Sequence, residues 1–224
     1  MSDPYVYKGT NVLKNKFDIR SNDKLDIVER KLSLYGSFLL DDMSLPSAFD
    51  FKYLQTIHKT LFGDLYDFAG EVRTVNIAKE IPFANVTFLQ ENINSIFSEL
   101  KKDNLSDLSK KDFADRLAYY KTEINLIHPF REGNGRSIRY FISSLAKAHG
   151  YELDFSNISK SEYMQAMKKS YLDHSILSEL FYNNLTDLNL VQSKSNSIKS
   201  KISNAKDKSI RYNTNKDKSF SKNL

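Results

Sequence analysis

Residues 111–150 read KDFADRLAYYKTEINLIHPFREGNGRSIRYFISSLAKAHG and carry the clearest pattern in the chain. In the first half, apolar side chains recur every three or four residues, which is the spacing of one face of an α-helix. These side chains are Phe113, Leu117, Tyr120, Ile124 and Ile127. The pattern predicts one helix over residues 111–127 and a second over 136–149 that ends at Gly150. The glycine-containing loop between the two helices is polar, so chemistry is expected there.

The rest of the chain reads mainly as helix. Helical spacing of apolar residues predicts helices over the ranges 23–40, 47–61, 89–100, 159–171 and 175–188. Residues 72–84 differ, because their apolar residues partly alternate with polar ones and Pro82 suits the edge of a sheet. We therefore predict an all-α, mainly helical fold with one short β-hairpin.

Composition limits the class of protein. A length of 224 residues with 40% hydrophobic residues suffices for one domain with a real core. The absence of Cys excludes disulfides and thiolate zinc sites. Residues 1–17 are polar and no stretch approaches the length of a membrane span, so a cytoplasmic protein without membrane contact is expected.

The positive charge of the chain is concentrated at its end. From Ser193 onward, nine Lys and Arg residues face two Asp residues, which gives this part a charge of +7. The whole chain carries +5, so residues 1–192 carry −2. Because apolar residues become sparse after about Val191, we predict a domain over residues 1–190 and a basic, disordered tail over 191–224.

The loop contains Gly133-Asn134-Gly135 and opens the second helix. The first turn of a helix exposes unpaired N–H groups, and the helix dipole adds about half a positive charge there. Two glycines let the backbone come close to an anion. Arg136 and Arg139 follow three residues apart, on neighbouring positions of one helix face, and arginine forks match phosphate oxygens. The arrangement predicts a polyphosphate site.

Two further residues make the site reactive. Glu132 precedes the glycines, and a carboxylate beside phosphates calls for a cation, for which Mg²⁺ is the natural choice. His128 precedes the loop by one short turn, and an imidazole with a pKa of roughly 6.5 is a suitable general base. Taken alone, a histidine at a helix end is usually a cap and Gly-Asn-Gly is usually a turn. The combination of the base, the carboxylate, the glycine pair and the two arginines within twelve residues predicts nucleotide chemistry.

At these residues the chain resembles the Fic family. The family motif, His-Pro-Phe-x-(Asp/Glu)-Gly-Asn-Gly-Arg-x-x-Arg, matches residues 128–139 (HPFREGNGRSIR) at every fixed position. A second stretch, residues 61–73 (LFGDLYDFAGEVR), resembles the segment that leads into the flap hairpin of the family. The start of the chain, at residues 5–7 and 12–15, resembles compact bacterial members, so the likeness covers roughly residues 5–190.

The resemblance implies a helical Fic domain whose β-hairpin flap lies over the active site, and transfer of AMP from ATP to a Ser, Thr or Tyr hydroxyl of a target protein. His128 would be the base, Glu132 would hold Mg²⁺, and residues 133–135 with Arg136 and Arg139 would bind the phosphates. The flap would hold the target by strand addition. Its candidate residues are Ile77, Lys79 and Phe83, with core packing as the alternative for Ile77 and Phe83.

The resemblance also bears on partners and regulation. Many members carry an inhibitory helix with Ser/Thr-x-x-x-Glu-Gly/Asn, whose Glu pairs with the second motif arginine, here Arg139. Only residues 87–92 fit that pattern, and they lie where no inhibitory helix is expected. We therefore expect a separate small helical antitoxin, and topoisomerase subunits are the implied targets. The alternatives are a host-directed effector secreted into another cell, and a binding module without transfer activity. The tail is a solvated extension, a secretion signal or a nucleic-acid tether.

Overall fold

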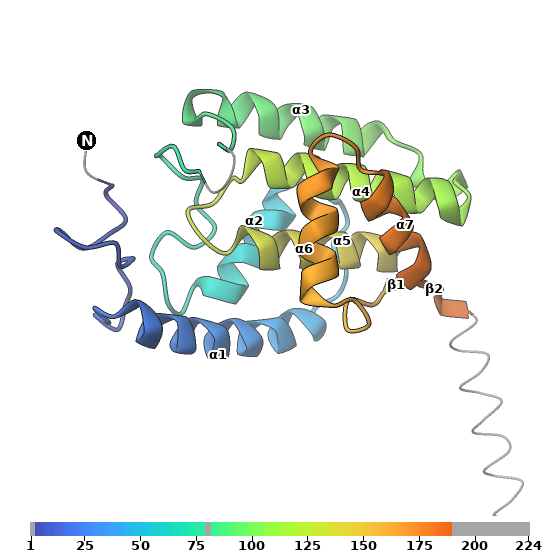
Figure 1. Cartoon of the computed structure of the whole chain (residues 1–224). Helices are drawn as coiled ribbons and strands as arrows, with labels where there is room; N and C mark the ends of the chain where they lie inside the picture. Colours follow the sequence, from blue (N-terminus) through green and yellow to red (C-terminus); the bar gives the residue numbers. More distant parts are fainter. Residues whose placement is uncertain (1–2, 79–81, 190–224) are drawn as a thin grey trace, which may run out of the picture.

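The computed structural model describes residues 3–78 and 82–189, and this part of the chain is a bundle of α-helices (Figure 1). None of its helices combines the length and apolar character that crossing a bilayer requires. The helices are α1 (Asn22–Asp41), α2 (Phe51–Phe62), α3 (Leu89–Lys102), α4 (Lys110–Ile127), α5 (Asn134–Ala148), α6 (Lys160–Ser170) and α7 (Ser175–Asn184). The mainly helical fold class predicted from the sequence is confirmed.

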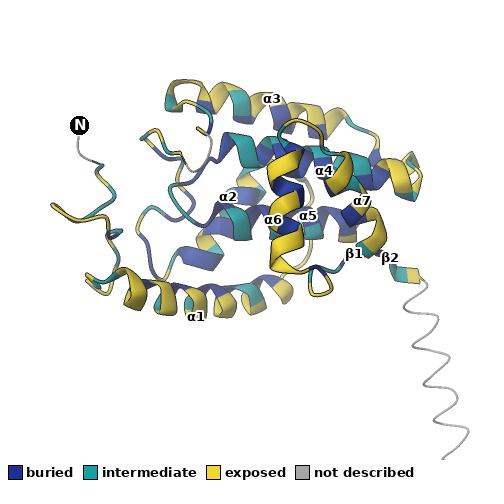
Figure 2. Ribbon diagram, viewed as in Figure 1, coloured by how far each residue is buried: buried dark blue, intermediate teal, exposed yellow. Residues whose placement is uncertain are grey.

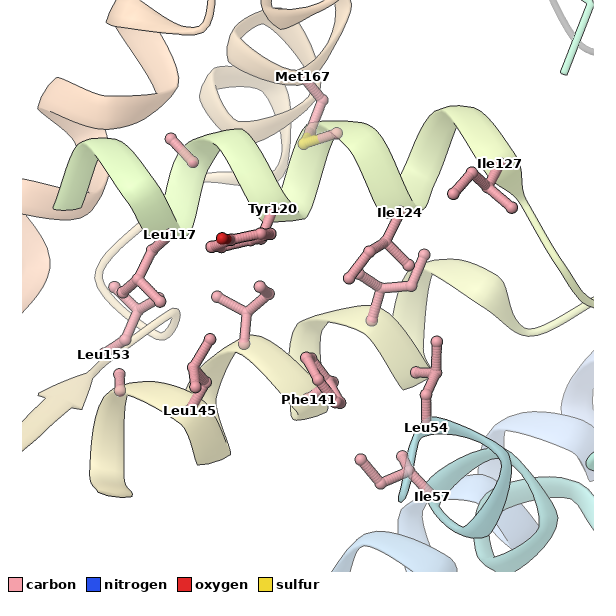
Figure 3. Packing of buried hydrophobic residues seen from close by; sticks show 14 of the residues in the cluster. Leu54, Ile57, Leu117, Tyr120, Ile124, Ile127, Phe141, Leu145, Leu153 and Met167 are labelled. Carbon is pink, nitrogen blue, oxygen red and sulfur yellow. The ribbon is translucent and has the colours of Figure 1, made fainter. Parts of the chain in front are cut away.

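Helices α4 and α5 form the centre of the bundle. Helix α4 packs against α3, α5 and α7, while α2 packs against both α5 and α1 (Figure 1). Helix α1 lies on the outside and turns a mostly exposed face to solvent (Figure 2). Figure 3 shows Tyr120 and Ile124 of α4 pointing toward α5, where Phe141 and Leu145 face them. The apolar spacing that predicted α4 therefore marks the face it buries.

Capping side chains explain where several helices begin. The Asp50 carboxylate accepts a hydrogen bond from the Tyr53 N–H at 2.9 Å, so α2 begins four residues later than the predicted start at residue 47. The Ser109 hydroxyl caps α4 in the same way through the Asp112 N–H. Helix α5 begins at Asn134 instead of residue 136, and its N-cap, Gly133, has a left-handed backbone conformation.

A two-stranded antiparallel sheet was not predicted. Strand β1 (Tyr151–Leu153) pairs with β2 (Leu185–Asp187), with Leu153 opposite Leu185 and both leucines buried. The prediction of a helix over residues 175–188 was therefore wrong at its end, since α7 ends at Asn184. The two strands lie far apart in the sequence, and only the tertiary fold brings their three-residue segments together.

The predicted hairpin over residues 72–84 is reduced to a single bridge in the described residues. Ala78 pairs with Pro82, and the Phe83 N–H donates to the Ile77 carbonyl at 3.3 Å. Closer to the root of the flap, the carbonyls of residues 75 and 84 accept hydrogen bonds from the Arg73 side chain instead of from a facing strand. The hydrogen bonds of the Arg73 side chain therefore take the place of the bonds between two strands that the alternating pattern predicted.

Candidate active site

The loop between α4 and α5 is held closed by Asn134. Its side-chain Nδ2 donates to the Phe130 carbonyl at 2.7 Å, and its Oδ1 accepts from the Phe130 N–H at 2.9 Å. Both residues are buried, with Phe130 fully covered. The Asn134 side chain thus fixes the loop, and the group it can offer a ligand is its backbone N–H.

The N-terminus of α5 opens directly from this loop. The first intrahelical bond runs from the Ser137 N–H to the Gly133 carbonyl at 3.1 Å. The N–H groups of residues 134–136 precede that bond and point out of the helix end, where the helix dipole is positive. This end of α5 is therefore built to receive an anion.

The two glycines of the loop serve different purposes. Gly133 has φ +80°, and a Cβ on it would lie 2.4 Å from Cε2 of Phe62. A Cβ on Gly135 would meet a single atom within 4 Å, Nη1 of Arg139 at 4.0 Å. Gly133 is therefore required by packing and backbone conformation, whereas the space beside Gly135 is open to a ligand.

Replacing each glycine by alanine separates these purposes. We expect Gly133→Ala to lower the free energy of unfolding by about 2–4 kcal/mol, because it adds left-handed strain to a steric clash. Gly135→Ala is the matched control and should leave stability unchanged or raise it by up to about 1 kcal/mol, since alanine favours helix. Urea unfolding of both variants measures the difference. Equal stability of the two variants would contradict this assignment.

His128 ends α4 in the left-handed conformation, with φ 50° and ψ 62°. The residue is 7% exposed, and Nδ1 of its imidazole lies 3.2 Å from the Asn125 carbonyl oxygen. A carbonyl can only accept, so Nδ1 carries the proton and Nε2 is the nitrogen able to take one. The ring of Phe83 stacks on the imidazole with centroids 3.7 Å apart. The geometry therefore suits a general base with a fixed orientation.

Glu132 lies between the base and the helix end. Its Oε1 accepts a hydrogen bond from the Gly133 N–H at 2.9 Å, and its carbonyl accepts one from Nε2 of His58 at 2.8 Å. The carboxylate is half-buried at the positive end of α5. A single carboxylate beside an anion site leaves room for phosphate and water, the ligand set that Mg²⁺ prefers, so this residue fits the metal.

His58 of α2 packs against the loop between α4 and α5. It is fully buried, its Nδ1 accepts from the Gly70 N–H at 2.8 Å, and its ring stacks on Phe130 with centroids 3.9 Å apart. Burial lowers the pKa of His58 to about 4, so the ring is neutral and donates from Nε2 to Glu132 near neutral pH. The sequence analysis assigned no role to this residue.

The two motif arginines have different surroundings. Arg136 donates to Glu29 and, at 2.9 Å, to the Ser33 hydroxyl, both from α1, and its guanidinium lies over the Phe62 ring. Arg139 lies beside Gly135, on the open side of α5. Arg136 is thus tied to α1, and Arg139 is the arginine better placed for a ligand.

The Glu29 carboxylate has a second donor. Burial and this bond raise the pKa of Tyr66, so its hydroxyl stays protonated and donates to Glu29. The carboxylate therefore holds both Tyr66 and Arg136. Glu29 was not predicted from the sequence, although its spacing of four residues from both Leu25 and Ser33, which puts the three on one helix face, was a signal.

The predicted flap residues lie in different places. Phe83 contacts His128, and Ile77 is half-buried near the bridge of the flap. Lys79 lies outside the described residues. Arg73, which the sequence analysis quoted without a role, donates from Nε to the His128 carbonyl at 2.8 Å. A single arginine within a largely apolar segment was the signal for it.

Comparison with known proteins agrees with this geometry. The chain is 37% identical over 189 residues to protein adenylyltransferase VbhT of Bartonella schoenbuchensis, which covers 83% of this chain but 40% of that protein. It is 32% identical over 166 residues to a probable protein adenylyltransferase Fic of Escherichia coli, which covers 73% of this chain and 82% of the relative.

A solved structure shows the same fold. The BepC protein of Bartonella tribocorum, a translocated effector with bound AMPPNP, superimposes with a TM-score of 0.74 and 28% identity. The match covers 82% of this chain and 96% of that one. The Fic/DOC family model matches residues 48–146, which include the loop and most of α5. Together with the 32% identity to the Escherichia coli relative over 82% of its length, this match shows that the chain belongs to the Fic/DOC family.

Proposed function

We propose that this chain is a protein adenylyltransferase, which transfers AMP from ATP to a Ser, Thr or Tyr hydroxyl of a target protein. The observation that carries the proposal is the placement of the His128 imidazole and the N-terminus of α5 at the two ends of one short, rigid loop. Relatives named as protein adenylyltransferases and a neighbour that binds an ATP analogue support it.

His128 acts as the base in this reaction. Nε2 takes the proton of the target hydroxyl while its oxygen forms a bond to the α-phosphorus of ATP. The bond from the α-phosphorus to the bridging oxygen breaks, and pyrophosphate leaves with the electron pair. The Nδ1–H bond to the Asn125 carbonyl holds the ring in the tautomer that this step needs.

The phosphates lie at the start of α5. Backbone N–H groups of residues 134–136 and the open space at Gly135 receive them, and Arg139 offsets their charge. Arg136 contributes mainly by orienting this region through its bonds to α1. Glu132 would hold Mg²⁺, which supplies further positive charge for the leaving group when it is bound.

The flap presents the target. The flap over residues 72–84, with Ile77, Lys79 and Phe83 as candidate contacts, holds an extended target segment that adds to it as a strand. A segment held on the flap lies near the base, because Phe83 of the flap stacks on the His128 imidazole. Topoisomerase subunits are the targets we expect.

Regulation comes from a separate small helical antitoxin that carries the inhibitory Glu. Arg139 lines a cavity of about 360 Å³ between α1 and α5, which Arg30 and Arg136 also line. A glutamate brought there would compete with the nucleotide for Arg139. The protein then works as the toxin of a pair in the cytoplasm, with a Fic domain over residues 1–190 and a tail over 191–224.

Labelled ATP tests this function. The full chain is incubated with bacterial lysate, Mg²⁺ and ATP that carries the label at either the α- or the γ-phosphate. We expect protein labelling from the α-phosphate alone. Label from the γ-phosphate would identify a kinase-like reaction. Absence of both labels, after removal of any co-purified small protein, would favour a module that only binds nucleotide.

A further inference from the structure

His128 sits in a backbone conformation that needs support. In the described residues, Asp18 and His128 are the non-glycine positions with positive φ. A left-handed residue with a Cβ costs roughly 1–2 kcal/mol, and it persists only where the surroundings hold it. The conformation matters here because it decides where α4 ends and where the imidazole points.

The Arg73 side chain supplies this support. Arg73 is 1% exposed, and within the described residues the hydrogen bonds of its side chain all end on neutral carbonyls. Nε donates to the His128 carbonyl at 2.8 Å, Nη1 to Val75 at 2.6 Å, and Nη2 to Ala84 at 2.5 Å and Ile127 at 3.2 Å. The Arg73 N–H adds a bond to the Pro129 carbonyl at 2.8 Å. The guanidinium therefore ties the two sides of the flap root to the carbonyls of Ile127 and His128, and the Arg73 main chain adds the contact to Pro129.

Burying the Arg73 guanidinium among carbonyls costs folding free energy. Burial lowers the pKa of Arg73, and carbonyl dipoles compensate a buried charge less than a carboxylate does. A fold needs such a group only where several carbonyls must be held in a fixed arrangement, and the planar fork of arginine suits that task. The carbonyls held here belong to the flap root and to residues 127–128 at the C-terminal end of α4.

Phe83 fixes the imidazole itself. The two rings are nearly parallel, with an interplanar angle of 14°. Phe83 is 9% exposed and is held from both sides, since its own N–H donates to Ile77 and the next N–H, of Ala84, donates to Leu126 at 3.0 Å. With one face of the imidazole covered and Nδ1 bonded to Asn125, the ring has little freedom to rotate.

We propose that Arg73 and Phe83 are positioning residues for the base: Arg73 sets the backbone of His128, and Phe83 sets the plane of its ring. The flap root is therefore part of the catalytic scaffold in addition to its role in presenting the target. This inference rests on the proposed AMP transfer for its kinetic consequences, but the orientation of the imidazole can be measured without any activity.

The kinetic test compares Phe83→Leu with Phe83→Tyr. Leucine keeps the apolar contact and removes the ring, so we expect kcat for AMP transfer to fall about 10–100-fold, with KM for ATP changed less than threefold. Tyrosine keeps the ring and should restore kcat to within about threefold of the wild type. Arg73→Lys, which keeps the charge and loses the fork, should lower kcat in the same way.

Phe113→Leu provides the matched control. This phenylalanine is fully buried and its ring contacts His149, so the substitution removes the same group from another histidine, away from the loop. It should lower the thermal midpoint while leaving kcat per folded molecule unchanged. A Phe83→Leu variant that retains kcat, or that changes only KM for the target, would overturn the proposal.

Nitrogen NMR of the imidazoles gives the second measurement, with the His128 signals assigned by their loss in His128→Ala. The wild type should show a single Nδ1–H tautomer, and Phe83→Leu should show averaging of two tautomers. If the wild type transfers no AMP but shows this change, the proposed function fails and the positioning role stands. If both proteins show the same tautomer, the positioning role fails whatever the activity.

Discussion

Replacement of His128 by alanine is expected to lower kcat for AMP transfer by roughly 10²–10⁴-fold, the usual contribution of a positioned general base. The variant retains the N-terminus of α5, Glu132 and Arg139, so the affinity for ATP should change by less than about threefold. Initial rates with α-labelled ATP, together with calorimetric titration of ATP, separate the two quantities.

The backbone at this position requires a control. Alanine at φ 50° adds strain, whereas asparagine tolerates the left-handed conformation and cannot act as the base. His128→Asn should therefore match the stability of the wild type more closely than His128→Ala does, while both lose transfer to a similar extent. If His128→Asn kept more than a tenth of the wild-type rate, His128 would not be the base.

Replacement of Lys121 by methionine is expected to stabilise the protein by about 1–4 kcal/mol at pH 7 and below. Lys121 is 1% exposed on α4, and the charged neighbour that shifts its pKa is Arg139 on α5, another cation. Burial, and then Arg139, lower the pKa of Lys121 to about 7. Methionine has a similar shape and carries no charge into this environment.

The stabilisation by Lys121→Met should decrease as the pH rises. Between pH 7 and the pKa of 10.5 of a free lysine, the unfolded chain binds a proton that the folded chain lacks, so the stability of the wild type rises with pH. Below pH 7, Lys121 is protonated in both the folded and the unfolded chain, so the full free-energy cost of burying its charge is present. The difference between Lys121→Met and the wild type should therefore be greatest at pH 6 and shrink toward pH 9.

Urea unfolding at pH 6, 7, 8 and 9 measures this difference. Lys111→Met, which makes the same change on the exposed side of α4, should alter stability by less than about 0.5 kcal/mol at each pH. A Lys121→Met protein that is less stable than the wild type at pH 6 would show that the buried ammonium is compensated.

The sequence predicted the helices well where a strong apolar period met a capping signal. Helix α4 was predicted to within one residue, because Phe113 to Ile127 hold the period over its whole length. The loop at residues 128–136 could also be interpreted locally, since free N–H groups at a helix start attract an anion in any fold. Only the structure showed that Gly133 serves the packing against Phe62. Local patterns failed for β1 and β2, each of which is three residues long and forms only by pairing with the other.

The sequence by itself determined the helical fold, the position of the loop between α4 and α5, and the family, because each depends on residues that are neighbours along the chain. The tertiary structure alone decided that Glu29 holds Arg136 across 107 positions and that Arg73 holds His128 across 55. The spacing of residues along the chain does not predict which side chains meet when their segments are so far apart in the sequence. Such partners are chosen by how whole helices pack, and that packing fixes the arginine and the imidazole in place.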